Sequence, residues 1–339
     1  RNNMVDFTSI QEVTQAIINK LNSSADRKSI APLYAFNATW KTRLSVEFNW
    51  LNGIFNETEE FDEIESSEIP DIKVFSYNAF IEDLFNWDNE DFIQSFKQHW
   101  VFEFIEKQDL EWSIKDIYKD ITNSKIEPKF NYVDKTVTFP IITTSEEQGI
   151  LENNIKIAKS EESIFIWSIN FAILKVAIDA LNTNDDDRIT KKFNNLEYIV
   201  IDDPVSSIDD TWIITIADKL FELIKSYKGN QINFLLTTHH ALFYNVLFNS
   251  FKRLNKLKYK DNWYPYVLSK TYDNKIQLDI KNYDTPFSYH ISTINIIKKA
   301  ISGNHIERYH FNLFRSLLEK TANFLGYDGF WSCILWDRK

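Results

Sequence analysis

The chain has 339 residues, 44% of them hydrophobic, which is enough to bury a large core and to form one large domain with a smaller one. Its uninterrupted apolar stretches are far shorter than the roughly 20 residues of a membrane-spanning helix, and no segment resembles a signal peptide. The single cysteine, Cys333, excludes an internal disulfide framework and a cysteine-based zinc site, and is typical of the reducing cytoplasm.

The formal net charge of −11 is unevenly distributed. Residues 250–339 carry 15 Lys/Arg and 8 Asp/Glu, a net of +7, whereas the rest of the chain carries 23 and 41, a net of −18. We expect only the basic C-terminal part to contact a polyanion, although an incidental asymmetry also explains the counts.

The first segments predict a helix followed by a phosphate-binding loop. Residues 8–23 have the spacing of an amphipathic helix, capped by Thr8 or Ser9. Residues 31–45 then read as an apolar strand, a short loop and the start of a helix. This order of strand, loop and helix is typical of a phosphate-binding loop. Such a loop has the sequence pattern GxxxxGK[ST], and its backbone N–H groups surround the phosphates.

The loop keeps only part of that pattern. Lys41 and Thr42 stand where a lysine meets phosphate and a hydroxyl meets magnesium, and Asn37 lies within the loop. Ala35 and Trp40 occupy the two glycine positions, and an indole stands where the backbone must approach a phosphate. We expect the fold of this loop to be kept and its affinity for nucleotide to be weak.

Residues 73–89 predict another strand and turn, with Asn78 at the position of a magnesium-sensing residue. A turn asparagine explains Asn78 equally well. Residues 90–130 have helical spacing and predict a helical insertion, and residues 135–143 predict a strand.

Two acidic residues follow the apolar strand YIVI at residues 198–201. Asp202 ends this strand, from which a carboxylate can hold magnesium against nucleotide phosphates, and Asp203 would orient the attacking water. A helix cap or a turn is the alternative for an isolated pair of aspartates.

The residues that follow make this alternative improbable. Ser207, Ile208 and Asp209 match the D-loop of ATPases of the ABC type, and His239, at the end of the apolar strand 234–238, matches their switch histidine. These motifs follow one another in the order found in such an ATPase: a strand, the pair DD, the motif SSxD and a second strand that ends in TH.

The signature LSxGE of ABC-type ATPases is also altered here. Its counterpart is Ile157 to Glu161, where Ala158 replaces serine and Ser160 replaces glycine at the start of a long apolar helix. Lys159, Ser160 and Glu161 remain candidates for contact with a nucleotide, and a plain capped helix is the alternative. The chain has 6 glycines, and none lies in either of these loops.

The pattern changes from about residue 264. Residues 264–290 predict a pair of strands, and two helices follow. In the second, residues 305–327, helical spacing predicts that Phe311, Phe314, Leu318 and Phe324 are buried. Arg315 and Glu319 share one face, and a surface ion pair explains them as well as a catalytic pair does.

Several blocks together indicate a family. They are YNAFIEDLFNWDN, IAKSEESIFIW, YIVIDDPVSSIDD, TTHHALFYNVLFN, FSYH and ERYHFNLFRSLLEKTANFLGY. In this order and spacing the chain resembles, over essentially its whole length, the bacterial anticodon nucleases of the PrrC type. The resemblance implies an α/β, ABC-type P-loop NTPase domain, residues 1–263, and a mostly helical, HEPN-like nuclease domain, residues 264–339.

The resemblance also implies roles and partners. Arg315 and Glu319 match the catalytic pair for metal-independent cleavage of tRNA in the anticodon loop, and Asp284 matches the segment that contacts the anticodon. Mg²⁺ with ATP or GTP would bind the NTPase domain, which would form homo-oligomers. A type I restriction-modification enzyme would be the partner in defence against phage.

Such nucleases carry a histidine about thirty residues beyond the glutamate, and this chain stops before that point. His310, 5 residues before Arg315, is a poor substitute because it lies about 140° around the helix. We therefore expect that the sequence is truncated. The alternative function is a non-catalytic ABC-type regulatory protein with a degenerate nucleotide site. A DNA-repair ATPase is disfavoured because no long coiled coil separates the two halves.

Overall fold

The structure is a computed structural model. It describes residues 4–23, 28–35, 41–51, 72–78, 85–88, 92–96, 99–145, 149–206, 208–256, 262–270, 275–280, 288–303, 305–327 and 329–331. The chain divides into two compact units, Arg1–Asn282 and Tyr283–Lys339.

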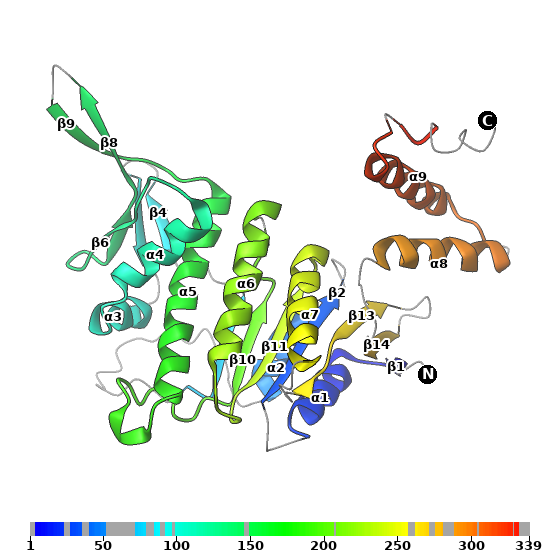
Figure 1. The fold of residues 1–339 in the computed structure, drawn as a ribbon, viewed down its shortest axis with the longest axis horizontal. Helices are drawn as coiled ribbons and strands as arrows, with labels where there is room; N and C mark the ends of the chain where they lie inside the picture. The colour runs from blue at the N-terminus through cyan, green and yellow to red at the C-terminus, as the bar shows by residue number, and fades with distance from the viewer. Residues whose placement is uncertain are drawn as a thin grey trace. The chain divides into compact units, whose positions relative to one another are not determined.

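The first unit is built on a mixed sheet (Figure 1). In the described residues this sheet has eight strands, in the order β1-β14-β13-β2-β11-β10-β3, with β12 paired to β2. The strands are β1 (Met4–Phe7), β2 (Ser29–Ala35), β3 (Val74–Asn78), β10 (Tyr198–Asp202), β11 (Asn233–Thr238), β12 (Asn262–Trp263), β13 (Tyr266–Lys270) and β14 (Ile276–Ile280). Because β2, β11, β10 and β3 are parallel, their carboxyl ends meet at one edge of the sheet.

Helices cover both faces of this sheet. They include α1 (Ile10–Leu21), α2 (Lys41–Leu51), α5 (Lys159–Leu181), α6 (Asp210–Ser226) and α7 (Ala241–Lys256). Successive side chains of β10 alternate between the faces: Tyr198 and Val200 join the core that includes α1 and α2, whereas Ile199 and Ile201 join the core that includes α5, α6 and α7. The α/β architecture predicted for this part of the chain is confirmed.

Two of the predicted helices form as expected. Ser9 caps α1, since its hydroxyl accepts a hydrogen bond of 3.2 Å from the backbone N–H of Glu12. Helix α5 is long and apolar enough to span a membrane by length and composition, but 72% of the relevant window is buried inside the protein. A helix that is apolar on all sides is typical of such a core position.

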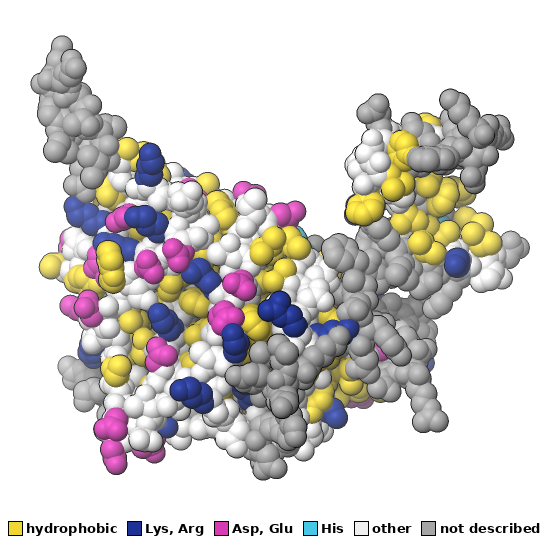
Figure 2. Space-filling model, viewed as in Figure 1, with side chains coloured by type: hydrophobic (Ala, Val, Ile, Leu, Met, Phe, Trp, Pro, Cys, Tyr) yellow, Lys and Arg dark blue, Asp and Glu magenta, His cyan; other side chains and the backbone are white. Residues whose placement is uncertain are grey.

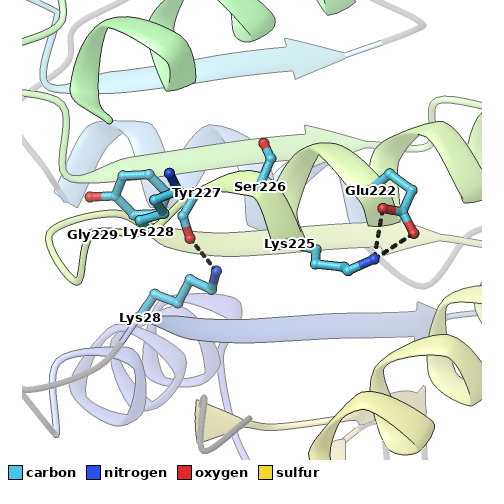
Figure 3. Close-up of a pocket in the computed structure, with 7 residues that line it drawn as sticks. All are labelled: Lys28, Glu222, Lys225, Ser226, Tyr227, Lys228 and Gly229. Carbon is cyan, nitrogen blue, oxygen red and sulfur yellow. Dashed lines mark hydrogen bonds and ion pairs between the residues drawn. The ribbon is translucent and has the colours of Figure 1, made fainter. Parts of the chain in front are cut away.

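A buried lysine joins the start of β2 to the end of α6 (Figure 3). Lys28 is 4% exposed, and its Nζ donates to the carbonyl oxygens of Ile224 (2.9 Å) and Tyr227 (2.6 Å). A cation is favourable there because the last carbonyls of a helix lack partners within the helix. The pocket beside this contact is lined by Lys28, Glu222, Lys225, Ser226, Tyr227, Lys228 and Gly229.

The predicted helical insertion at 90–130 contains strands as well as helices. It includes α3 (His99–Lys107) and α4 (Glu111–Thr122), beside the sheet β4-β5-β7-β6. The strands are β4 (Phe85–Asp88), β5 (Ile93–Phe96), β6 (Lys129–Asn131) and β7 (Thr136–Thr138). The strand predicted at 135–143 is divided between β7 and β8 (Pro140–Ser145), and β8 pairs with β9 (Gly149–Asn154).

The strand pair predicted at 264–290 forms, but it belongs to the main sheet. Strand β13 runs parallel to β2, with Tyr266 opposite Leu33, and β14 pairs with β1. Leu268 and Leu278 are buried in the same core as Leu33. The boundary between the units therefore follows Asn282, later than the predicted boundary at residue 263.

In the described part of the second unit, α8 (Ser288–Ser302) precedes α9 (Arg308–Phe324). The predicted burial on α9 is wrong for three residues: Phe311, Phe314 and Phe324 are 66%, 48% and 88% exposed. Helical spacing predicts which rings share a face of the helix. It does not predict whether another element packs against that face. Figure 2 shows hydrophobic side chains over much of the visible face of this unit.

Candidate functional site

The carboxyl edge of the parallel strands brings together polar side chains from three strands. Asp202, at the end of β10, lies opposite Asn78 of β3 and Thr237 of β11. Asn78 Nδ2 donates to Asp202 Oδ2 over 3.1 Å, and the hydroxyl of Thr237 donates to Asp202 Oδ1. Both carboxylate oxygens of Asp202 therefore have hydrogen-bond donors.

Asp202 is 1% exposed, so its carboxylate lies in a buried, hydrogen-bonded environment. Burial raises the pKa of its carboxyl, the hydrogen bond from Thr237 acts in the opposite direction, and the charge of Asp203 adds to the rise. No group of three or more His, Cys, Asp or Glu suited to a metal occurs among the described residues. Magnesium usually takes one or two protein ligands beside phosphate and water, so Asp202 and the hydroxyl of Thr42 have the oxygen donors that fit it.

Both carboxylate oxygens of Asp203 contact several donors. Its Oδ1 accepts hydrogen bonds from the hydroxyl of Thr238 (3.2 Å) and from the backbone N–H of His239 (3.3 Å). Its Oδ2 contacts Nδ1 of His239 and lies 3.5 Å from Nζ of Lys41. The backbone of Asp203 has a positive φ of 55°, which aspartate tolerates better than most residues.

These contacts set the charge of Asp203. Burial alone would raise the pKa of its carboxyl, but the hydrogen bond and charge of His239 and the charge of Lys41 hold the pKa below its usual value. Asp203 is thus an ionised carboxylate surrounded by donors.

Lys41 and His239 both contact the carboxylate of Asp203, and Asn78 is hydrogen-bonded to the adjacent Asp202. Lys41 is the first residue of α2 and is 8% exposed, and Thr42 follows it, half-buried.

The structure describes some of the other predicted site residues and leaves others undescribed. Ala35 ends β2 and is buried, and Asp209 is exposed just before α6. Three further predicted site residues lie outside the described residues, Asn37, Ser207 and Asp284, as does Trp40.

The altered signature forms the start of α5. Ala158 stands at the N-cap with φ −65° and ψ 154°, and its side chain makes no capping hydrogen bond. The carboxylate of Glu161 accepts from the backbone N–H of Ala158 over 3.0 Å, and Lys159 pairs with Glu162 at 2.9 Å. Ser160 is half-buried in the same turn. The start of α5 therefore lacks the capping hydroxyl that a serine would supply.

The predicted pair on α9 is formed. Nε of Arg315 donates to Oε1 of Glu319 over 2.8 Å, and the side chains are 70% and 46% exposed. Such an exposed pair adds only a few tenths of a kcal/mol to stability. Nearby His310 is buried, and its Nδ1 accepts from the backbone N–H of Glu307 over 2.9 Å.

Sequence analysis missed two residues of this candidate site. Thr237 and Thr238 supply side-chain donors to Asp202 and Asp203, one to each carboxylate. The available signal was two hydroxyl residues at the end of an otherwise apolar strand, where buried hydroxyls need hydrogen-bond partners.

The parallel strands of the mixed sheet present a buried lysine, two strand-end carboxylates and a histidine at one edge, in a protein of the α/β class. No protein-family model matches the sequence. The chain is 37% identical to the anticodon nuclease of Escherichia coli over an alignment of 342 positions, which covers 97% of this chain and 83% of the relative. The chain therefore belongs to the anticodon nuclease family.

The solved structures that resemble this chain include two at 10% sequence identity. The SMC head domain from Thermotoga maritima gives a TM-score of 0.33 and covers 75% of this chain and 90% of that domain. An SmcHead bound to the C-winged helix domain of ScpA gives 0.28, with 53% of this chain and 45% of that one covered.

Proposed function

We propose that this protein is an NTP-regulated anticodon nuclease that cleaves tRNA in the anticodon loop. The observation that carries the proposal is the 37% identity to an anticodon nuclease over 97% of the chain. The Arg315–Glu319 pair, formed and accessible on α9, supports it from the structure.

The proposed cleavage needs no metal. Glu319 takes the proton of a ribose 2′-hydroxyl, whose oxygen attacks the adjacent phosphorus, and the bond to the 5′-oxygen breaks. The guanidinium of Arg315 stabilises the negative charge that develops on the phosphate oxygens. A proton donor completes the 5′-hydroxyl, and the other product is a 2′,3′-cyclic phosphate. The HEPN-like nuclease domain would contact the anticodon through Asp284.

The first unit is proposed to regulate this cleavage by binding ATP or GTP with Mg²⁺. Thr42 and Asp202 would hold the ion, which would neutralise phosphate charge. The proposed nucleotide contacts are Asn37, Lys41, Asn78, Lys159, Ser160, Glu161, Ser207 and Asp209. We also propose homo-oligomers formed through this unit, a type I restriction-modification enzyme as partner in phage defence, and a cytoplasmic location.

The test is cleavage of total tRNA by the full chain with ATP or GTP and magnesium, with cut sites mapped by end sequencing. We expect anticodon-loop cuts that leave 5′-hydroxyl ends. Arg315→Ala and Glu319→Gln should each lose more than about 100-fold in rate. Lys320→Ala is the matched control, since it removes a charge from the same helix about 140° away from Arg315. Intact tRNA under every nucleotide condition would refute the proposal.

A second candidate, a non-catalytic regulatory protein with a degenerate nucleotide site, is favoured by two observations. Ala158 offers no hydroxyl at the start of α5, and Lys41 is held by Asp203. Calorimetric titration with ATP and magnesium, followed by a phosphate-release assay, separates the candidates. Tight binding with turnover excludes the second candidate.

A further inference from the structure

One side of helix α9 presents two exposed aromatic rings beside two arginines, and we propose that it is a stacking surface for the unpaired bases of single-stranded RNA. Phe311 and Phe314 would stack on bases, and Arg308 would contact a phosphate beside them. This inference rests on the proposed cleavage of tRNA and names the surface that would hold the unpaired loop next to Arg315 and Glu319.

The first argument is exposure. Phe311 and Phe314 are 66% and 48% exposed, although both are large apolar side chains. Arg308 is exposed as well. The buried residues of α9 are His310 and Ala322. Exposed apolar groups that gather on one surface often mark an interaction site, and here the rings are accessible to a ligand.

The second argument is the position of these side chains around the helix. With 3.6 residues per turn, Arg308 and Phe311 both lie within about 40° of Arg315. Phe314 lies about 60° beyond Phe311. Glu319, whose Oε1 accepts a 2.8 Å hydrogen bond from Nε of Arg315, also lies within about 40° of Arg315. The rings therefore share one side of α9 with the proposed catalytic pair.

The third argument is the spacing along the helix. Phe311 is three residues from both Arg308 and Phe314 and four residues from Arg315. At these spacings Cβ atoms are about 5–6 Å apart. Phe311 thus has a second ring and two guanidinium groups as its neighbours. A base that stacks on this ring would keep its own phosphate close to an arginine.

The fourth argument is charge, which favours RNA as the occupant of this surface. Two arginines and one glutamate, Glu319, lie within about 40° of one another around the helix. Residues 250–339 as a whole carry a net charge of +7, whereas the rest of the chain carries −18. Surfaces that bind single strands combine positive charge with aromatic rings, and the phosphates of RNA are the complementary charge.

Stacking on these rings also suits the proposed reaction. Proteins bind single-stranded RNA loops by stacking bases that are splayed out of the loop on aromatic side chains. Phe311 is about 6 Å from Arg315 along the helix axis, so a base stacked there would place the strand beside the proposed catalytic pair. Because every base has a flat face, this surface would add affinity for unpaired RNA and little choice of sequence.

The experiment is the binding of a short fluorescent single-stranded RNA of mixed sequence to the full chain, measured by anisotropy. The background is Glu319→Gln, which slows cleavage of the probe. We expect Phe311→Leu and Phe314→Leu each to weaken binding about 10-fold, and Phe311→Trp to keep it. Phe324→Leu is the matched control, since Phe324 is 88% exposed on the same helix but lies about 180° from Arg315.

Two further measurements separate the rings from the arginine. A fully paired RNA of the same length offers no unpaired base, so the two leucine variants should bind it as well as the parent chain does. Arg308→Gln should reduce the slope of log K against log salt concentration by about 0.7, the effect of one phosphate contact to a single strand. The leucine variants should leave this slope unchanged.

The outcomes separate this inference from the proposed function. Leucine variants that bind the single strand as tightly as the parent chain overturn the inference, even if the wild type cleaves tRNA. Equal losses in Phe311→Trp and Phe311→Leu also overturn it, because tryptophan keeps a stacking ring. A smaller oligomer of Phe311→Leu in light scattering, with RNA binding unchanged, would assign the surface to a second copy instead. Ring-dependent binding by a chain that cleaves no tRNA supports the inference and refutes the proposed cleavage.

Discussion

Asn78 and Asp202 end two neighbouring parallel strands at the same register, and the Asn78 amide donates a 3.1 Å hydrogen bond to the Asp202 carboxylate. The residues are 7% and 1% exposed, so water cannot replace this donor. In the sequence Asn78 is equally well explained as a turn asparagine. In the structure it holds the carboxylate of Asp202, the proposed magnesium ligand.

Asn78→Ala should therefore lower the free energy of unfolding by about 1–3 kcal/mol, because it removes one of the hydrogen-bond donors of a buried carboxylate. Urea denaturation followed by circular dichroism measures the change. Asn19→Ala, at an exposed position of α1, should stay within about 0.5 kcal/mol of the wild type. Equal effects of the two substitutions would contradict the assigned role of Asn78.

Lys192→Met should stabilise the protein at pH 7. Burial lowers the pKa of Lys192 from 10.5 to about 8, and the charge of Lys107 acts in the same direction. Because the folded-state pKa is depressed, the stability that Lys192 contributes is present above pH 10.5 and is lost as pH falls through about 8. At pH 7 the protein bears the cost of a buried charge.

We expect Lys192→Met to raise the free energy of unfolding by up to about 2 kcal/mol at pH 7. This value allows for solvent screening and for the favourable position of the Lys192 amine over the Phe104 ring. The gain should shrink as pH rises from 8 to 10.5. Urea denaturation across this range measures it. Lys191→Met is the control, since Lys191 is exposed, and a similar gain there would show that burial is not the cause.

Exchange of Arg315 and Glu319 separates catalysis from helix stability. The double variant Arg315→Glu with Glu319→Arg keeps a pair four residues apart, in the order that favours a helix. The free energy of unfolding should change by less than about 0.5 kcal/mol, whereas tRNA cleavage should fall more than about 100-fold. Thermal melting and a cleavage assay test both expectations. If the double variant still cleaves tRNA, Arg315 and Glu319 form only a surface ion pair and have no catalytic role.

Ala158→Ser should stabilise α5 by about 1 kcal/mol, because Ala158 already has the extended backbone of an N-cap and lacks only the hydroxyl. The same hydroxyl restores the serine of the signature, so ATP turnover should rise as well. Ala158→Gly is the comparison: glycine is also a better N-cap than alanine and should stabilise α5 by nearly as much, but it supplies no hydroxyl and should leave turnover unchanged. A rise in melting temperature without a rise in turnover would limit this position to a structural role.

Trp40→Gly should raise the affinity for ATP, because glycine lets the backbone approach a phosphate where an indole blocks it. Isothermal titration calorimetry measures the change. Trp112→Gly, at an exposed position of α4, controls for the general effect of losing a tryptophan. Unchanged affinity after Trp40→Gly would show that the loop accommodates the indole.

Much of the fold and site was predictable because local patterns specify it. The apolar run before Asp202 predicted β10, and the polar residues at the ends of these strands mark the candidate site. Ser9 predicted the start of α1 because capping depends on the neighbouring backbone alone. The exposure of Phe311 and Phe314 was not predictable, because spacing on one helix contains no information about what packs against it.

The sequence by itself determined which residues end the strands, where the helices begin and which side chains share a face of a helix, since these follow from hydrophobic periodicity and local backbone preferences. Only the tertiary structure decided that β13 and β14 extend the main sheet and that Asp203 is enclosed by Lys41, Thr238 and His239. The reason is that these contacts join residues far apart in the chain, and strand pairing and burial create them together.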